Sequence, residues 1–216
     1  IIRIDHFRGL VSYWEVPYGQ KTAINGKWVK TAGRDLFIAL KNKIGSDLSE
    51  FFIAEDLGII TDDVVKLREE FSLPGMRILE FATFPSSDSL DKKNSPDPYL
   101  PENYIKNCVA YPGTHDNDTI RGWFNSLEDN AKKDVLHYFK IKDIKELNFA
   151  IIESLLSSKA DRVLFLMQDI LELDSSARMN KPGTFGSHNW SWRLRREELT
   201  EDLMKRLSFL NKQYGR

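Results

Sequence analysis

The chain opens with Ile1-Ile2-Arg3-Ile4-Asp5, and a second stretch, Phe51-Phe52-Ile53-Ala54-Glu55, has the same arrangement. Each is a short, mainly apolar run that stops at a carboxylate. Short apolar runs bounded by polar residues are typical of buried parallel strands. The two stretches therefore predict two strands, each with an acidic side chain at its carboxyl end.

Three more apolar runs follow, at residues 76–81, 108–111 and 163–167. The run at 108–111 ends just before Gly113-Thr114-His115-Asp116, and the last run leads into Gln168-Asp169. Segments with helical spacing of apolar residues separate the runs. One such segment ends at Gly45, and a second starts at Thr61. Helical segments also cover about residues 119–158, and a last one contains Leu203, Leu207 and Leu210.

Alternating strands and helices predict an α/β fold of the βα type. In (β/α)₈ barrels the reacting groups lie at the carboxyl ends of the strands, where these acidic residues are expected. Five strands cannot close a barrel that needs eight. We therefore expect a partial (β/α)₈ TIM barrel with helical insertions, whose N-terminal strands are missing, and residues 1–216 as the C-terminal portion of one catalytic domain.

Two segments between the predicted elements are long. An aromatic segment after Asp5 contains Tyr13, Trp14, Tyr18 and Trp28, and we interpret it as a loop. A polar, Pro-rich segment covers residues 84–107. It is too long for a simple connection and is a candidate binding loop.

The composition is that of an ordinary globular protein, with 41% hydrophobic and 29% charged residues. The 31 basic and 32 acidic residues nearly cancel, which argues against nucleic acid or an anionic membrane as the main partner. No apolar run approaches the roughly 20 residues of a membrane span. Cys108 is the only cysteine, so a cytoplasmic location is expected. Since the first strand begins without a Met, we expect this chain to be a fragment.

Asp5 and Glu55 suit the cleavage of a glycosidic bond with retention, which needs a nucleophilic carboxylate and a protonated carboxyl group. Arg3 lies two residues before Asp5 on the same face of the strand, where it would orient that carboxylate. Desolvation at the end of an apolar strand would raise the pKa of Glu55, as a general acid requires. The alternative for both residues is a helix N-cap or a surface ion pair.

A third polar cluster is Thr114-His115-Asp116-Asn117-Asp118-Thr119, which is rich in groups that bind sugar hydroxyls. The alternative is a helix-capping turn, which Asp and Asn favour. The spacing of the histidines and glycines predicts neither a metal site nor a nucleotide site.

Several motifs, in this order, resemble the 4-α-glucanotransferases, also called amylomaltases or disproportionating enzymes (glycoside hydrolase family 77). The resemblance spans nearly the whole chain. The motifs are Arg3-Ile4-Asp5-His6-Phe7-Arg8-Gly9, Ala54-Glu55-Asp56-Leu57-Gly58, Pro74-Gly75-Met76-Arg77, Tyr99-Leu100-Pro101, Gly113-Thr114-His115-Asp116-Asn117-Asp118-Thr119, Gln168-Asp169, Ala177-Arg178-Met179-Asn180-Lys181-Pro182-Gly183-Thr184 and Asn189-Trp190-Ser191-Trp192-Arg193.

The resemblance implies that Asp5 is the nucleophile, that Glu55 is the general acid/base, and that Asp116 holds the donor sugar. Arg3 and His115 would assist around that sugar. The five strands would correspond to strands four to eight of the family's barrel. No cofactor is implied. Glu102 and Ser187-His188 depart from the residues expected in many relatives and would alter acceptor contacts.

Tyr13 and Trp14 are the aromatic residues expected to contact sugar, since their segment follows the nucleophile, and Asn117 is a further candidate contact. Core packing is the alternative for each tryptophan. The activity implied is transfer of α-1,4-glucan segments between maltooligosaccharides by a retaining double displacement. The alternatives are an α-amylase-type hydrolase and an inactive glucan-binding fragment. Open sheet edges would also let such a fragment self-associate.

Overall fold

The computed structural model describes residues 1–85 and 97–216. The chain divides into two compact units, which are described separately. Unit 1 consists of Ile1–Met76 with Asn107–Val109, and unit 2 of Arg77–Lys106 with Ala110–Arg216. The candidate binding loop at 84–107 lies partly outside the described residues.

In unit 1, the two strands predicted from the opening motifs are present and adjacent. β1 (Ile2–Ile4) pairs in parallel with β4 (Phe52–Ala54), in a register that places Ile4 opposite Ala54. The backbone N–H of Glu55 continues this pairing by donating to the Ile4 carbonyl at 3.0 Å. Asp5 and Glu55 therefore leave the sheet at the same edge.

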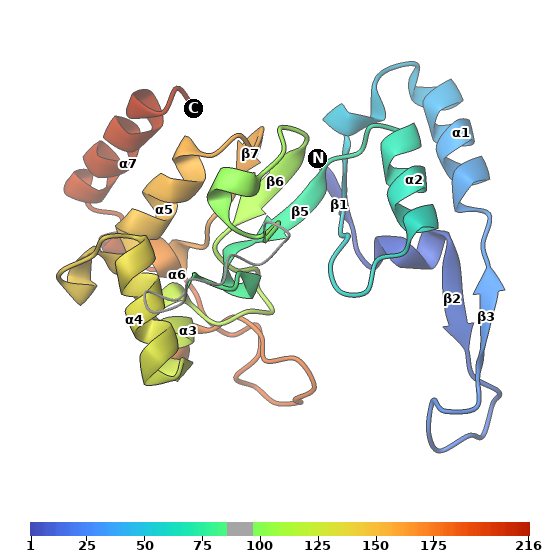
Figure 1. Cartoon of the computed structure of the whole chain (residues 1–216), viewed down its shortest axis with the longest axis horizontal. Helices are drawn as coiled ribbons and strands as arrows, with labels where there is room; N and C mark the ends of the chain where they lie inside the picture. Colours follow the sequence, from blue (N-terminus) through green and yellow to red (C-terminus); the bar gives the residue numbers. More distant parts are fainter. Residues whose placement is uncertain (86–96) are drawn as a thin grey trace. The chain divides into compact units, whose positions relative to one another are not determined.

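Two helices of unit 1, α1 (Gly33–Ile44) and α2 (Asp62–Glu70), share one apolar core (Figure 1). Phe37 of α1 lies 5.8 Å from the ring of Phe7 and 5.2 Å from that of Phe71. Gly45 ends α1 in the left-handed conformation, at φ 69°, which glycine adopts without steric cost. Both helices were predicted from the spacing of their apolar residues.

The aromatic segment predicted as a loop is instead a β-hairpin, so that prediction was wrong in part. β2 (Ser12–Glu15) pairs antiparallel with β3 (Lys27–Lys30), and Trp14 lies opposite Trp28. The two indole rings contact edge to face with centroids 5.3 Å apart. Aromatic pairs across strands stabilise such hairpins. Because the connection at residues 16–26 is long, the sequence carries no short turn signal that would predict this pairing.

A three-stranded sheet has the order β5 (Gly75–Ile78), β6 (Cys108–Tyr111) and β7 (Arg162–Val163). Two predicted strand boundaries were wrong. The run at 76–81 leaves the sheet after Ile78, because Ala82 N–H bonds the Leu79 carbonyl in a 3₁₀ turn. The run at 163–167 contributes only its start, because the Leu166 carbonyl accepts the first bonds of α6 (Met167–Ile170).

Unit 2 contains the remaining long helices, α3 (Ile120–Ser126), α4 (Asp129–Tyr138), α5 (Leu147–Ser157) and α7 (Glu201–Gln213). One of its apolar clusters joins α5, α6 and α7 through Phe149, Ile170 and Leu210. Among the described residues, no helix is long and apolar enough to cross a bilayer. Short 3₁₀ helices lie at Phe7–Leu10, Leu48–Glu50, Leu79–Phe81, Pro101–Asn103, Ile144–Glu146, Ser175–Ala177 and Arg196–Glu198.

The free edge of β1 predicts self-association. Within the described residues β1 pairs with β4 alone, and the Ile2 side chain on this strand is 61% exposed. An apolar, unpaired edge recruits strands from other chains. Ile2→Lys should therefore lower the average mass seen by light scattering, since a charged residue disfavours edge pairing.

Ile24→Lys is the matched control, because Ile24 is also exposed but lies outside the strands. A monodisperse monomer for the unaltered chain, or equal effects of the two substitutions, would contradict this prediction.

Candidate active site

The β1 end of the site holds Asp5 beside Arg3. Arg3 Nη2 donates to Asp5 Oδ1 at 2.8 Å, as the strand spacing predicted. The Arg3 Nε also contacts Met76 Sδ of β5 at 3.4 Å, which fixes the guanidinium from a second strand. The Asp5 side chain is 77% exposed. Asp5 is thus oriented by one cation and left open to a ligand.

Glu55 is half-buried, and backbone donors hold its carboxylate. Glu55 Oε2 accepts from His6 N–H at 2.7 Å, and Oε1 accepts from Leu57 N–H at 3.0 Å. His6 adopts the left-handed conformation, with φ 47°, which is uncommon for a residue other than glycine. This turn ties the Glu55 carboxylate to the residue that directly follows Asp5.

Asp56, which follows Glu55, anchors this end of β4. Its Oδ1 accepts from Met76 N–H at 2.7 Å, and its Oδ2 lies 3.3 Å from Arg68 Nε. Both side chains of the Asp56–Arg68 pair are buried. Gly75 permits the approach, because a Cβ there would lie 2.3 Å from Asp56 Oδ2. No role for Asp56 was predicted from the sequence, although the glycine of the Pro74-Gly75-Met76-Arg77 motif indicates a close approach at this place.

Replacing Asp56 by Ala should destabilise unit 1 strongly. Arg68 would keep a buried charge without its main partner, and breaking such a pair typically costs about 3–5 kcal/mol. Urea unfolding followed by tryptophan fluorescence measures the loss.

Glu69→Ala is the control, because the exposed Glu69 carboxylate lies 3.5 Å from the same guanidinium. That change should cost less than about 1 kcal/mol. Equal losses for the two variants would show that the buried Asp56–Arg68 pair does not anchor this end of β4.

In unit 2, Asp116 lies in a turn and is held by a second segment. Its Oδ1 accepts from Asn180 Nδ2 at 2.7 Å, and its main-chain carbonyl accepts from Arg178 Nη2 at 2.6 Å. His115 Nε2 lies 3.4 Å from Asp116 Oδ2. The side chain of Asp116 remains 46% exposed. Two motifs that are far apart in the sequence therefore meet around one accessible carboxylate.

Trp190 adds a third motif to this cluster. Its backbone N–H donates to the Met179 carbonyl at 2.6 Å, and its ring centroid lies 5.0 Å from that of the His115 ring. The indole is 53% exposed. From the sequence, core packing was the alternative to sugar contact for Trp190. The observed exposure beside His115 makes it a better candidate for sugar contact than its spacing suggested.

The capping interpretation of residues 114–119 applies to Thr119, not to Asp116. Thr119 Oγ1 accepts from Gly122 N–H at 3.1 Å and caps α3. Asn117 Oδ1 accepts from both the N–H and the hydroxyl of Thr114, at 3.0 and 2.9 Å. The oxygen of Asn117 thus stabilises the turn, and its contact with sugar stays a prediction.

Tyr13 and Trp14 lie on the β2–β3 hairpin and are partly exposed. Trp14 Nε1 donates to the Ala23 carbonyl at 2.8 Å, which fixes the indole within the hairpin. Tyr13 hydroxyl contacts Glu15 Oε1 at 3.3 Å. Their role in sugar binding also stays a prediction.

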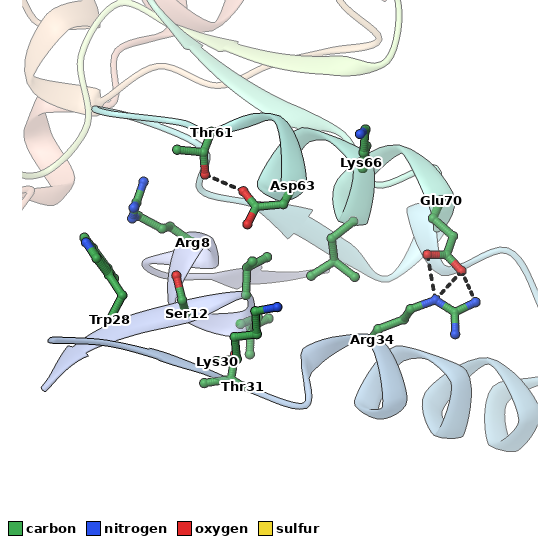
Figure 2. A pocket seen from close by; sticks show the side chains of 13 residues that line it. Arg8, Ser12, Trp28, Lys30, Thr31, Arg34, Thr61, Asp63, Lys66 and Glu70 are labelled. Atoms are coloured by element: carbon green, nitrogen blue, oxygen red, sulfur yellow. Dashed lines mark hydrogen bonds and ion pairs between the residues drawn. The ribbon is translucent and has the colours of Figure 1, made fainter.

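Unit 1 has a cavity of about 710 Å³ (Figure 2). Leu10, Val11 and Leu67 give it apolar walls, and the Arg8 guanidinium lies 4.3 Å from the centroid of Trp28 at its side. Neither Asp5 nor Glu55 lines this cavity. The candidate carboxylates are therefore at an open strand end and not in this cavity.

Two carboxyl groups of unit 2 have strongly raised pKa values. Burial, with the nearby charges of Asp169 and Asp118, raises the pKa of Glu80 to about 9. Burial likewise raises the pKa of Asp169 to about 7.

Among the described residues, no group of three or more His, Cys, Asp or Glu side chains is arranged to hold a metal ion.

Comparisons with known proteins agree over the whole chain. The family model described as 4-alpha-glucanotransferase, for glycoside hydrolase family 77, matches residues 1–200. The 4-alpha-glucanotransferase of Clostridium butyricum is 45% identical over 217 aligned positions, covering 100% of this chain and 42% of that protein. The chloroplastic/amyloplastic 4-alpha-glucanotransferase of Solanum tuberosum is 44% identical, over 99% of this chain and 36% of that protein.

The fold agrees with that of a solved relative. Amylomaltase from Streptococcus agalactiae, solved in complex with acarbose, superposes with a TM-score of 0.87 at 35% identity, over 99% of this chain and 41% of that one. The chain thus spans about two-fifths of the relatives' length and shares the mixed α/β fold of the matching part. By family model, sequence and fold, the chain belongs to the 4-alpha-glucanotransferase family, glycoside hydrolase family 77.

Proposed function

We propose that this chain carries the catalytic carboxylates of a 4-alpha-glucanotransferase, which transfers α-1,4-glucan segments between maltooligosaccharides. The observation that carries the proposal is the 2.7 Å hydrogen bond from His6 N–H to Glu55 Oε2. This bond ties the Glu55 carboxylate to the residue that follows Asp5, at the ends of two paired parallel strands. Retaining glycoside cleavage needs two carboxyl groups in such proximity.

In the first half-reaction, the ionised Asp5 attacks the anomeric carbon of the donor. Glu55 gives its proton to the glycosidic oxygen as that bond breaks. The products are a β-glycosyl ester on Asp5 and a shortened maltooligosaccharide with a new hydroxyl group. Arg3, at 2.8 Å from Asp5 Oδ1, holds the nucleophile in one orientation through both steps.

In the second half-reaction, the hydroxyl of an acceptor sugar attacks the ester carbon. Glu55, now ionised, takes the proton of that hydroxyl, and Asp5 leaves as a carboxylate. Two inversions give a product with the α configuration of the donor. The backbone N–H groups of His6 and Leu57 donate to the Glu55 carboxyl group. They hold it in place while it alternates between the protonated and the ionised form.

Asp116 is assigned to the donor sugar, as the resemblance to the family implies. Asn180 and Arg178 fix its side chain and its main chain, and the side chain is exposed enough to receive sugar hydroxyls. His115 and the exposed indole of Trp190 offer a polar edge and an apolar face next to it. Pyranose rings present both kinds of surface.

We also propose that residues 1–216 are the C-terminal portion of a (β/α)₈ catalytic domain and contain its strands four to eight. The coverage of about two-fifths of each relative supports this, as does the succession of β1, β4, β5, β6 and β7 along the chain. A cytoplasmic location is proposed because Cys108 is a buried, free thiol. The potato relative is named chloroplastic/amyloplastic, so an organelle is the alternative.

Incubating the complete enzyme with maltotriose tests the proposed activity. Water at about 55 M competes for the glycosyl ester, and only a bound acceptor hydroxyl overcomes that excess through proximity. We expect glucose and a ladder of longer maltooligosaccharides, with the number of reducing ends nearly constant.

Reducing ends that rise steadily without longer products would instead identify an α-amylase-type hydrolase. Binding of maltooligosaccharides without any turnover would leave a glucan-binding protein. Asp5→Asn serves as the inactive control, because it removes the nucleophile and keeps the size of the side chain.

A further inference from the structure

Glu80 contacts the turn that carries Asp116. It lies in the 3₁₀ helix after β5, and its N–H donates to the Pro112 carbonyl at 3.1 Å. Its side chain is packed against Gly113, where a Cβ would lie 2.6 Å from Glu80 Oε1. The side chain of Asn117 is hydrogen-bonded to the same carboxyl group. Glu80 therefore supports both ends of the turn at residues 113–117.

The surroundings of Glu80 are rich in negative charge. Asp118 contributes from the loop before α3 and Asp169 from α6. Asp118 Oδ2 accepts from Ser175 Oγ at 2.8 Å, and Asp169 Oδ1 accepts from Ile120 N–H at 2.8 Å. Arg178 is the cation that faces this group, and its Nη1 lies 3.8 Å from Asp118 Oδ2.

Arg178 connects this buried group to Asp116. The same guanidinium donates to the main-chain carbonyls of Asp116 and Asn180, at 2.6 and 2.8 Å. It therefore balances the buried carboxyls while it fixes the turn and the segment that holds Asp116. An additional negative charge nearby would compete for the guanidinium and alter these contacts.

Burial and the two neighbouring carboxylates raise the pKa of Glu80 to about 9, so its carboxyl group is neutral near pH 7. A neutral carboxyl packs against Gly113 and Asn117 without adding charge to the group. Ionisation at higher pH would place one more negative charge beside Asp118 and Asp169. That charge would repel Asp118 and Asp169 and draw Arg178 away from its main-chain contacts with Asp116 and Asn180.

We propose that Glu80 is a positioning residue, whose neutral carboxyl group holds the Gly113–Asn117 turn and thereby keeps Asp116 in place for the donor sugar. This inference rests on the proposed function, since it concerns the carboxylate assigned to that sugar. Glu80 itself need not touch the substrate. Its effect is on donor binding, and therefore on KM more than on kcat.

Two substitutions separate charge from shape in the complete enzyme. Glu80→Gln keeps the size and hydrogen bonding of the neutral acid, so KM near pH 7 should stay within about twofold of the unaltered value. Its KM should also lack the rise that we expect for the unaltered enzyme as the pH passes 9. Glu80→Leu removes the hydrogen bond to Asn117 and should raise KM about tenfold at pH 7, which corresponds to one buried polar contact.

Glu128→Gln is the matched control, because Glu128 is an exposed glutamate of the same unit. It should change neither KM nor its pH dependence. A Glu80→Gln enzyme with the same alkaline rise in KM as the unaltered enzyme would overturn the proposal.

A titration of the 216-residue chain tests the same idea without activity. In ¹³C NMR of glutamate carboxyl groups, the signal lost in Glu80→Gln should titrate near pH 9. A midpoint near 4.5, the ordinary value, would overturn the proposal. Because ionisation is disfavoured only in the folded chain, stability should fall as the pH rises from about 4.5 to 9. The Glu80→Gln variant should lack that part of the fall.

The two failures are distinguishable. Absence of glucan transfer by the unaltered enzyme at every pH would reject the proposed function and leave the titration result unaffected. Transfer activity with a Glu80 signal that titrates near 4.5 would reject the positioning role alone.

Discussion

The parallel pairing of β1 with β4 is the constraint on which unit 1 depends. Its register places Ile4 opposite Ala54, so Asp5 and Glu55 leave the sheet together. A shift by one residue would turn one of the two side chains to the other face. Asp56 fixes the end of β4 to β5 and to α2, through its bonds to Met76 N–H and Arg68. The catalytic assignment is thus built on backbone hydrogen bonds and one buried ion pair.

Unit 2 positions its carboxylate differently, through side chains that join distant segments. Asp116, Asn180 and Trp190 are brought together by hydrogen bonds from Asn180 to Asp116 and from Trp190 N–H to Met179. Glu80 packs against this turn, and burial raises the pKa values of Glu80 and of the nearby Asp169. Such groups are costly in the ionised form, and polar sites of this kind are retained where geometry matters more than stability.

Much of this architecture could be predicted from the sequence, because apolar runs that end at acids are local signals. The pairing of Arg3 with Asp5 follows from a strand spacing of two, and Gly45 marks the end of α1. The hairpin at Trp14 and Trp28 could not be predicted in this way, since its strands pair across a long connection. The end of the last predicted strand was also wrong, because the Leu166 carbonyl accepts the first hydrogen bonds of a helix there.

The candidate site could be predicted only where its residues belong to local sequence motifs. The three carboxylates stand in recognisable motifs, and His115 lies beside one of them. Glu80, Asp56 and Arg178 drew no functional assignment, since their roles depend on burial and on partners far along the chain. Burial of a charged group is a property of the folded chain, and a sequence pattern indicates it poorly.

The assignment of Asp5 as nucleophile is the central claim, and trapping of the glycosyl–enzyme ester tests it most directly. The complete enzyme, with Glu55→Gln to slow turnover of the ester, would be treated with α-maltosyl fluoride. Its fluoride ion leaves without needing a proton as the maltosyl group is transferred. Peptide mass spectrometry should then find one maltosyl group on the peptide that contains Asp5, and none in the additional variant Asp5→Asn. A maltosyl group on any other residue, or unchanged labelling after Asp5→Asn, would contradict the account.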